Sequence, residues 1–193
     1  MKRAVTCTTE GPEETRQLAA VVAGALRPGD LVALTGELGA GKTCFVQGAA
    51  KALGVTQRVT SPSFLLRRDY EGDVIVQHLD VYRLDTLQEV IELGFGEATE
   101  PGHRRVTFIE WGDAMAPLLP VAYLEVEISL TDVRASTGAA DDGFRRSVIV
   151  RPHGDDWLRR IVGLAVDLQP WRKGIEGLPD PGRGSATAGG EEG

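Results

Sequence analysis

Residues 36–43 read Gly-Glu-Leu-Gly-Ala-Gly-Lys-Thr, a full match to the phosphate-binding pattern G-x-x-x-x-G-K-[ST]. An apolar stretch, residues 30–35, precedes this loop, and residues 44–53, which favour a helix, follow it. Glycines let successive backbone N–H groups point at one anion, and the helix directs its positive N-terminal end to the same place. The stretch therefore predicts an α/β fold built around a nucleoside triphosphate site.

Each residue of this loop has an expected role. Lys42 supplies a mobile positive charge for the terminal phosphates, and we expect it to be catalytic as well. The Thr43 hydroxyl is placed to bind Mg²⁺. The loop residues expected to bind the nucleotide are Gly36, Glu37, Leu38, Gly39, Ala40, Gly41, Lys42 and Thr43.

The composition is that of one globular domain. The chain has 193 residues, of which 42% are hydrophobic and 25% charged. Its apolar stretches are too short for a membrane span, and its N-terminus has no apolar core of a signal peptide. Two cysteines, Cys7 and Cys44, make neither a disulfide framework nor a metal cluster. We expect a cytoplasmic protein without a membrane partner.

The charge and one missing residue type exclude several classes. The net charge of −7 argues against nucleic-acid binding by the chain alone, which usually needs a basic face. The sequence contains no Asn, so it has neither the guanine-reading N-K-x-D motif of GTPases nor the catalytic loop of protein kinases. Residues 69–72 spell D-x-x-G, but they lie between two apolar stretches and predict a hairpin turn.

Periodicity predicts the other elements. We expect a mixed central sheet flanked by helices, in a single domain. The expected strands are residues 4–8, 30–35, 64–70, 73–80, 106–110, 123–130 and 144–150, with 64–80 forming one hairpin and the last two strands forming another pair. The expected helices are residues 9–26, 44–53, 86–93 and 155–168.

Two carboxylates complete the candidate site. Asp80 and Glu110 each end a predicted strand, where the metal or the attacking water of a nucleotide hydrolase is held. His78 lies two residues before Asp80 and is interpreted either as a base or as a packed structural histidine. Ser61, after the loop helix, belongs to a polar segment, residues 60–64, that is typical of a switch or of an ordinary loop.

The composition changes at Pro170. Residues 170–193 are rich in Gly and Pro and can bury little surface. We therefore expect a P-loop domain over residues 1–169 and a disordered tail over residues 170–193.

These motifs together resemble the TsaE (YjeE) family of small bacterial ATPases, which assist the synthesis of N6-threonylcarbamoyladenosine in tRNA. The resemblance spans about residues 9–150, with its elements in the family's order and spacing. Its specific elements are His-Leu-Asp-Val-Tyr-Arg-Leu (78–84) and Ile-Glu-Trp-Gly-Asp (109–113). The others are the loop, Thr-Ser-Pro-Ser-Phe (60–64) and Glu-Leu-Gly-Phe (92–95).

The resemblance implies a P-loop fold that uses ATP and Mg²⁺, with the metal held by Thr43 and Glu110. It implies that Asp80 is the second acidic catalytic residue and that Arg134 lies near the nucleotide. It also implies two protein partners, TsaB and TsaD. In the family TsaD transfers the threonylcarbamoyl group to the adenosine next to the anticodon, and TsaE uses ATP to permit repeated turnover. Contact with tRNA is then indirect, through the partners.

Two other functions use the same residues. A small-molecule kinase has the same loop, but usually adds an arginine-rich lid, and the internal arginine pairs at 67–68, 104–105 and 145–146 form no convincing lid in the sequence. A nucleotide-gated binding module would use ATP to order a docking surface, with hydrolysis incidental.

Overall fold

The computed structural model describes residues 3–62, 66–82, 104–112, 117–131 and 145–176. Its strands are β1 (Ala4–Thr9), β2 (Leu31–Thr35), β3 (Arg67–Tyr70), β4 (Ile75–Asp80), β5 (Arg105–Glu110), β6 (Tyr123–Thr131), β7 (Arg145–His153) and β8 (Arg172–Glu176). Its helices are α1 (Pro12–Gly24), α2 (Lys42–Ala52) and α5 (Gly154–Asp167).

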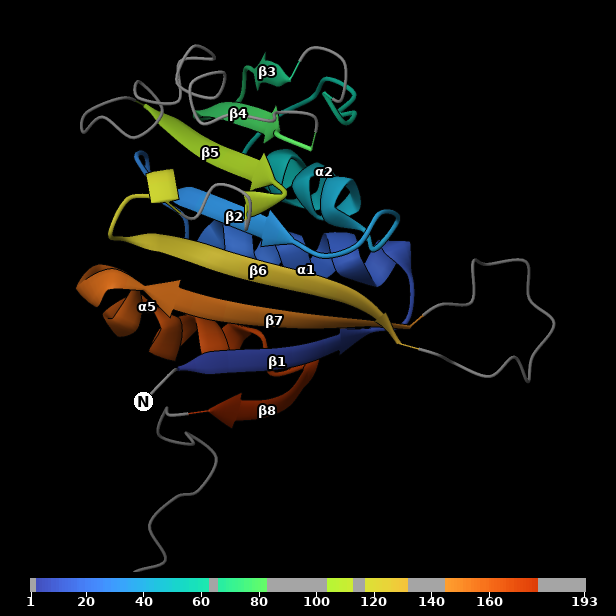
Figure 1. Ribbon diagram of the computed structural model, residues 1–193, viewed down its shortest axis with the longest axis vertical. Helices are drawn as coiled ribbons and strands as arrows, with labels where there is room; N and C mark the ends of the chain where they lie inside the picture. Colours follow the sequence, from blue (N-terminus) through green and yellow to red (C-terminus); the bar gives the residue numbers. More distant parts are fainter. Residues whose placement is uncertain (1–2, 63–65, 83–103, 113–116, 132–144, 177–193) are drawn as a thin grey trace, which may run out of the picture.

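The strands form one mixed sheet in the order β3-β4-β5-β2-β6-β7-β1-β8 (Figure 1). The centre is parallel, because β2 pairs in parallel with both β5 and β6, and β4 pairs in parallel with β5. The remaining pairs are antiparallel. The expectation of a mixed central sheet is confirmed.

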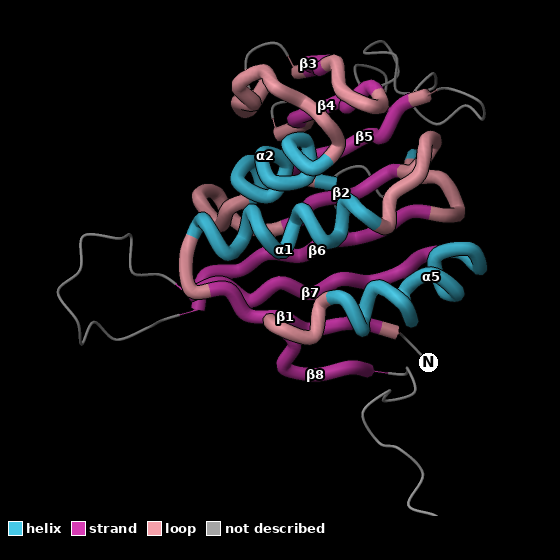
Figure 2. The backbone as a smooth tube through the Cα atoms, turned by 180° about the vertical axis from the view of Figure 1, so that it is seen from behind, coloured by secondary structure: helices cyan, strands magenta, loops and turns pink. Residues whose placement is uncertain are grey.

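The three described helices cover the same face of the sheet. Figure 2 shows α1, α2 and α5 in front of the strands, and Figure 1, from the opposite side, shows the strands in front of the helices. The larger core lies between these two layers and includes Val32, Leu34 and Phe45. A smaller cluster, which includes Leu31 and Ala33, lies on the other face. The central strand β2 is thus buried on both faces, as a parallel strand usually is.

Most predicted elements are confirmed. The 64–80 hairpin forms as β3 paired antiparallel with β4, and the last two predicted strands pair as β6 and β7. Helix α1 begins at Pro12 instead of Thr9, because Thr9 is the last residue of β1 and Gly11 is the helix N-cap. Pro suits this first position, because a backbone N–H there would have no hydrogen-bond partner within the helix. The helix predicted over residues 86–93 lies outside the described residues.

The end of the domain differs from the expected boundary. Residues 170–176 are ordered with the domain, and β8 pairs antiparallel with β1. Trp171 anchors the start of this strand, since its carbonyl accepts a hydrogen bond of 2.9 Å from the Thr8 backbone N–H. Composition missed this strand because an edge strand needs backbone partners more than apolar side chains. Residues 177–193 of the expected tail lie outside the described residues.

Within the described part of the chain, every helix falls short of the length and apolar character that a membrane crossing requires.

Helices α1 and α2 approach each other closely at one glycine. A Cβ built on Gly48 lies 2.2 Å from the carbonyl oxygen of Arg16, so the backbones touch at this point. A side chain at residue 48 forces the two helices apart.

We therefore expect Gly48→Ala to destabilise the protein by about 2 kcal/mol or more, because it overpacks a backbone contact. Gly163→Ala in α5 is the matched control. A Cβ there meets nothing within 4 Å, so this change should stabilise the helix by about 0.5–1 kcal/mol. Urea unfolding of both variants measures the difference, and equal effects would contradict the close helix approach.

Candidate nucleotide site

The glycine loop joins the end of β2 to the start of α2. Gly36, Gly39 and Gly41 have φ angles of 133°, 82° and 117°, a region that favours glycine. Gly36 has a second reason to be glycine, since a Cβ there lies 2.0 Å from the carbonyl oxygen of Ile128 on β6. The loop therefore folds into this shape because its glycines permit both the turns and the contact with the sheet.

The start of α2 is suited to an anion. Gly41 is the N-cap, and no side chain of the described residues caps this end. The first turn contains no acidic residue. A helix N-terminus of this kind offers backbone N–H groups and a partial positive charge, so it favours a phosphate.

Lys42 lies inside the loop with its amine well held. Its Nζ donates hydrogen bonds to the carbonyl oxygens of Gly36 (2.8 Å) and Glu37 (2.9 Å). The same nitrogen lies 3.8 Å from the ring centroid of Trp111, a cation–π contact. These contacts fix a positive charge at the mouth of the loop, where the terminal phosphates of a nucleotide would need it.

The two predicted carboxylates lie side by side. Asp80 and Glu110 are register partners at the ends of the parallel strands β4 and β5. Both are nearly buried, at 5% and 4% exposure. Because neighbouring strands are about 4.8 Å apart, the two acidic groups face the same small volume at this edge of the sheet. The structure thus brings both strand ends to one cavity.

Glu110 connects three elements. Its Oε1 accepts a hydrogen bond of 2.7 Å from the Thr43 hydroxyl on α2, and lies 2.9 Å from Nε2 of His78 on β4. His78 is fully buried, and the structure therefore supports its interpretation as a structural histidine that orients Glu110. The two predicted metal ligands, Thr43 and Glu110, are in direct contact.

Asp80 is held by the segment after α2. Its Oδ2 accepts a hydrogen bond of 2.8 Å from the Ser61 hydroxyl, and its Oδ1 accepts one of 3.3 Å from the Tyr82 backbone N–H. Residue Thr60 is fixed in turn by Tyr70, whose hydroxyl donates to its carbonyl oxygen at 3.1 Å. The segment interpreted as a switch or an ordinary loop thus touches a candidate catalytic carboxylate.

The loop, Ser61 and the two carboxylates surround one cavity of about 460 Å³. Its lining residues are Leu38, Gly39, Gly41, Lys42, Thr43, Cys44, Ser61, Asp80, Tyr82, Glu110 and Trp111. Of the predicted site residues, Gly36, Glu37 and Ala40 lie in the loop behind this lining. Arg134 and residues 63–64 lie outside the described residues.

Sequence reasoning left the role of Trp111 open. Trp111 has a φ of 65°, which is unusual for a bulky residue and places its indole over Lys42. Its ring centroid lies 4.8 Å from that of Tyr82, which is 60% exposed. The two rings form an aromatic wall of the cavity. In the sequence, the signal for Trp111 is its position directly after a strand that ends in a candidate catalytic carboxylate.

In the sequence, Arg146 on β7 stands out only as half of the arginine pair 145–146. It is 4% exposed, and its Nε donates a hydrogen bond of 3.1 Å to the carbonyl oxygen of Ala40. The same nitrogen lies 3.2 Å from a Cβ built on Gly41. A buried cation therefore supports the loop from a strand about a hundred residues further along the chain. No local pattern reveals such a contact.

The strand–glycine loop–helix unit, with two carboxylates at the ends of adjacent parallel strands, defines a P-loop NTPase-like α/β protein. Within that class the chain belongs to the TsaE family: the family described as "Threonylcarbamoyl adenosine biosynthesis protein TsaE" matches residues 9–137.

Individual relatives support the same family assignment. The tRNA threonylcarbamoyladenosine biosynthesis protein TsaE of Treponema pallidum is 40% identical over 114 residues, which cover 59% of this chain and 83% of the relative. The protein of the same name from Bacillus subtilis is 38% identical over 121 residues, 62% of this chain and 74% of the relative. A crystal structure of Bacillus subtilis YdiB has a TM-score of 0.68 and 29% identity, covering 86% of this chain and 97% of that chain.

Arg146 and its neighbour Arg145 allow a matched test of loop support. We expect Arg146→Met to lower the free energy of unfolding by about 2 kcal/mol, because it removes a buried charged donor from Ala40. It should also raise amide hydrogen exchange in residues 36–41.

Arg145→Met is the control, since Arg145 is half exposed and pairs with the exposed Glu10, a contact that contributes at most about 1 kcal/mol. Unchanged exchange in the Arg146 variant would show that the loop keeps its shape without this cation.

Proposed function

We propose that this chain binds and hydrolyses Mg-ATP in support of tRNA threonylcarbamoyladenosine biosynthesis, acting with the partner proteins TsaB and TsaD. The observation that carries the proposal is the 2.7 Å hydrogen bond between Thr43 and Glu110 beside the glycine loop. It brings together the hydroxyl and the carboxylate that a P-loop ATPase needs for its metal. Membership of the TsaE family supports the assignment to tRNA threonylcarbamoyladenosine biosynthesis.

The loop suits the phosphates of ATP. Its backbone turns on three glycines, the uncapped start of α2 adds partial positive charge, and Lys42 adds a full one. A cavity of about 460 Å³ adjoins these groups. The absence of Asn from the sequence removes the usual guanine-reading motif, which favours ATP over GTP.

The donor set also suits Mg²⁺. Thr43 and Glu110 would hold the ion, which when bound neutralises charge on the phosphate oxygens. Among the described residues no cluster of three or more His, Cys, Asp or Glu side chains forms a metal cage. That fits Mg²⁺, which usually takes one or two protein carboxylates and completes its shell with phosphates and water.

Asp80 is assigned to the attacking water. Its carboxylate lies beside Glu110 in register, and Ser61 and the Tyr82 N–H hold it in place. A carboxylate at this position orients a water molecule for in-line attack on the terminal phosphate and accepts its proton. His78 acts through Glu110, as a positioning residue.

Partner proteins explain how an acidic chain takes part in the modification of tRNA. With a net charge of −7, the chain leaves the contact with tRNA to TsaB and TsaD. In this proposal TsaD transfers the threonylcarbamoyl group, and ATP hydrolysis by this chain, weak when it is alone, permits repeated turnover.

One observation favours a second function, a nucleotide-gated binding module. Ser61 lies in the switch-like segment and donates directly to Asp80. A nucleotide that changes this contact could order a docking surface even without hydrolysis.

The kinase alternative gains no such support. Among the described arginine doublets, Arg68 donates to Thr60, Arg145 pairs with Glu10, and Arg105 lies at the end of β5 opposite Glu110. In a fourth doublet, on α5, Arg159 pairs with Asp156 and Arg160 with Asp30.

We expect Lys42→Ala to reduce ATP hydrolysis by roughly 100-fold, because it removes the charge that stabilises the terminal phosphates. The same variant should lose its ability to raise threonylcarbamoyladenosine yield above one product per TsaD. The assay combines TsaB, TsaD, tRNA and the activated threonylcarbamoyl donor. Lys173→Ala, exposed on β8, is the control. Hydrolysis unaffected by Lys42→Ala would overturn the proposal.

Asp80→Asn and Glu110→Gln separate hydrolysis from gating. Both are near-isosteric, and each should slow hydrolysis by roughly 100-fold because a carboxylate is lost. Asp80→Asn should still bind a fluorescent ATP analogue, whereas Glu110→Gln should bind it with a weaker dependence on Mg²⁺. If Asp80→Asn supports repeated turnover by TsaD while hydrolysis is lost, the gated module is the correct function.

A further inference from the structure

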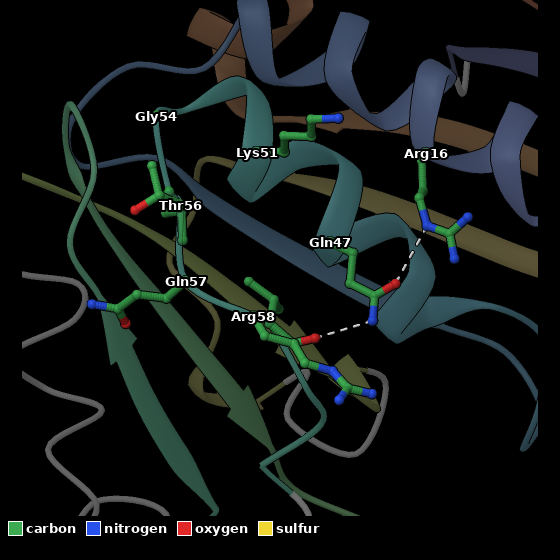
Figure 3. Close-up of a pocket in the computed structure, with 9 residues that line it drawn as sticks. Arg16, Gln47, Lys51, Gly54, Thr56, Gln57 and Arg58 are labelled. Carbon is green, nitrogen blue, oxygen red and sulfur yellow. Dashed lines mark hydrogen bonds between the residues drawn. The ribbon is translucent and has the colours of Figure 1, made fainter.

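A second cavity, of about 580 Å³, lies on the helical side of the molecule. Its walls come from α1, from the second half of α2 and from residues 54–59, which follow α2. Figure 3 shows Gln47 between Arg16 and Arg58, with Lys51 one turn further along α2. Among the described residues, this cavity and the nucleotide site have no lining residue in common, so the two are separate.

The lining is cationic. Arg16, Lys51 and Arg58 come from three different segments, and no acidic side chain is among the described residues that line the cavity. Arg16 pairs at 3.1 Å with Glu13, but that ion pair is exposed and contributes little. Lys51 and Arg58 are exposed, and the described part of the chain holds no ion pair of either. In a chain with a net charge of −7, this concentrates positive charge at one place.

The backbone that carries these cations is closely fitted. The contact between Gly48 and Arg16 fixes α1 against α2. At the end of α2, Gly54 has a φ of 84°, and the Val55 N–H donates to the Ala50 carbonyl oxygen at 3.0 Å. This is a glycine-terminated helix end, which sets the direction of the segment that follows. The three cations therefore surround a preformed hollow.

Three cations around one hollow suit an anion with three oxygens. A phosphate monoester carries a charge of about −1.5 to −2 and three strong acceptor oxygens, one for each cation. A carboxylate has two oxygens, which a single Arg side chain can satisfy. The volume of the cavity also lies within the range of roughly 300–1,000 Å³ that is usual for small-molecule sites. The lining therefore favours phosphate over carboxylate.

We propose that this cavity is a regulatory site for a small phosphorylated molecule, whose phosphate group contacts Arg16, Lys51 and Arg58. The phosphate comes either from inorganic phosphate or from a phosphate ester, and both present the same chemistry to the cavity. A polynucleotide is a poor ligand, because the acidic chain as a whole repels its backbone.

Hydrogen bonds connect this cavity with the nucleotide site. Arg16 Nε donates to Gln47 Oε1 at 3.4 Å, and Gln47 Nε2 donates to the Val59 carbonyl oxygen at 3.0 Å. Two residues later, Ser61 donates to Asp80 at 2.8 Å. A ligand that engages Arg16 thus acts on the segment that holds a candidate catalytic carboxylate.

The ligand slows ATP hydrolysis through this connection. A phosphate group that contacts both Arg16 and Arg58 ties residues 54–59 to α1, and so keeps Ser61 in its hydrogen bond with Asp80. A carboxylate that accepts such a bond is a weaker base for the attacking water, because the bond stabilises its charged form. This regulatory step rests on the proposed function, whereas binding of phosphate in the cavity does not.

The test is an NMR titration of the full-length chain with its nucleotide site filled by Mg²⁺ and a non-hydrolysable ATP analogue, which keeps the probes out of the phosphate loop. The probes are inorganic phosphate, glycerol 3-phosphate and succinate at matched ionic strength. The amide signal of Gly54 reports binding in the cavity, and that of Ser61 reports the connection to Asp80.

We expect both phosphate probes to shift the Gly54 and Ser61 signals, and succinate to bind at least about tenfold more weakly. Tighter binding of glycerol 3-phosphate than of inorganic phosphate assigns the site to a phosphate ester, and equal binding assigns it to free phosphate. Succinate that binds as tightly as the phosphates, or a Gly54 signal that no probe moves, would overturn the proposal. An unmoved Ser61 signal would overturn its regulatory part.

A charge-matched pair of variants locates the site. Lys51→Glu with Arg58→Glu should lower the affinity for the phosphate probes at least about tenfold, because two charge-assisted contacts are lost. Arg27→Glu with Lys173→Glu makes the same change in net charge at exposed positions outside the cavity, and should stay near wild type. Equal losses in both variants would show that net charge, and not the cavity, attracts the probe.

Steady-state hydrolysis tests the regulation. Glycerol 3-phosphate should lower the kcat of the wild type at least about fivefold without a change in KM, and should leave the kcat of the Lys51→Glu, Arg58→Glu variant unaltered. Gln47→Leu removes the relay, so this variant should bind the probe while its kcat no longer responds. A response of this variant equal to that of wild type would refute the relay.

Lys42→Ala separates this proposal from the proposed function. The variant should lose hydrolysis, yet its Gly54 signal should still move with the phosphate probes. A wild type that binds the probe in the cavity but hydrolyses no ATP would contradict the proposed function and leave the cavity assignment standing. A wild type that hydrolyses ATP but binds no probe would contradict the cavity assignment alone.

Discussion

The parallel pairing of β4, β5 and β2 is the constraint on which the rest of the structure depends. Parallel strands end at the same edge of a sheet, and that edge is where open α/β proteins bind their ligands. Here Asp80, Glu110 and the glycine loop after Thr35 all meet at it. Burial of β2 on both faces holds it in place, because its side chains pack alternately into the larger core and into the smaller cluster on the other face.

Glu110 shows how tightly the edge is organised. One carboxylate oxygen contacts Thr43 on a helix and His78 on the neighbouring strand. Hydrogen bonds to a buried charged group are stronger than those between neutral groups, and they restrain every partner at once. The candidate metal ligands are therefore positioned by the fold itself. Asp80 differs, because its partner Ser61 belongs to the loop after α2. Residues 54–59 of that loop also line a cavity between α1 and α2.

The sequence predicted the fold best where the signal is local. The glycine loop, the alternating strands β6 and β7, and the helices around them follow from spacing, because one buried face imposes a period of about two in a strand and 3.6 in a helix. The carboxylates at residues 80 and 110 were found for the same reason, since each ends an apolar run. Strand β8 was missed because it pairs with β1 at the other end of the chain, a contact that local composition does not record.

By itself the sequence determined the phosphate-binding loop, the order of the elements up to α5, the two strand-end carboxylates and the resemblance to the TsaE family. Only the tertiary structure decided that His78 orients Glu110, that Arg146 supports the loop, and that Arg16, Lys51 and Arg58 surround one cavity. These contacts join residues far apart in the chain. A short segment of sequence records the conformation of its own backbone, whereas the partner of a buried charge depends on how the strands and helices pack.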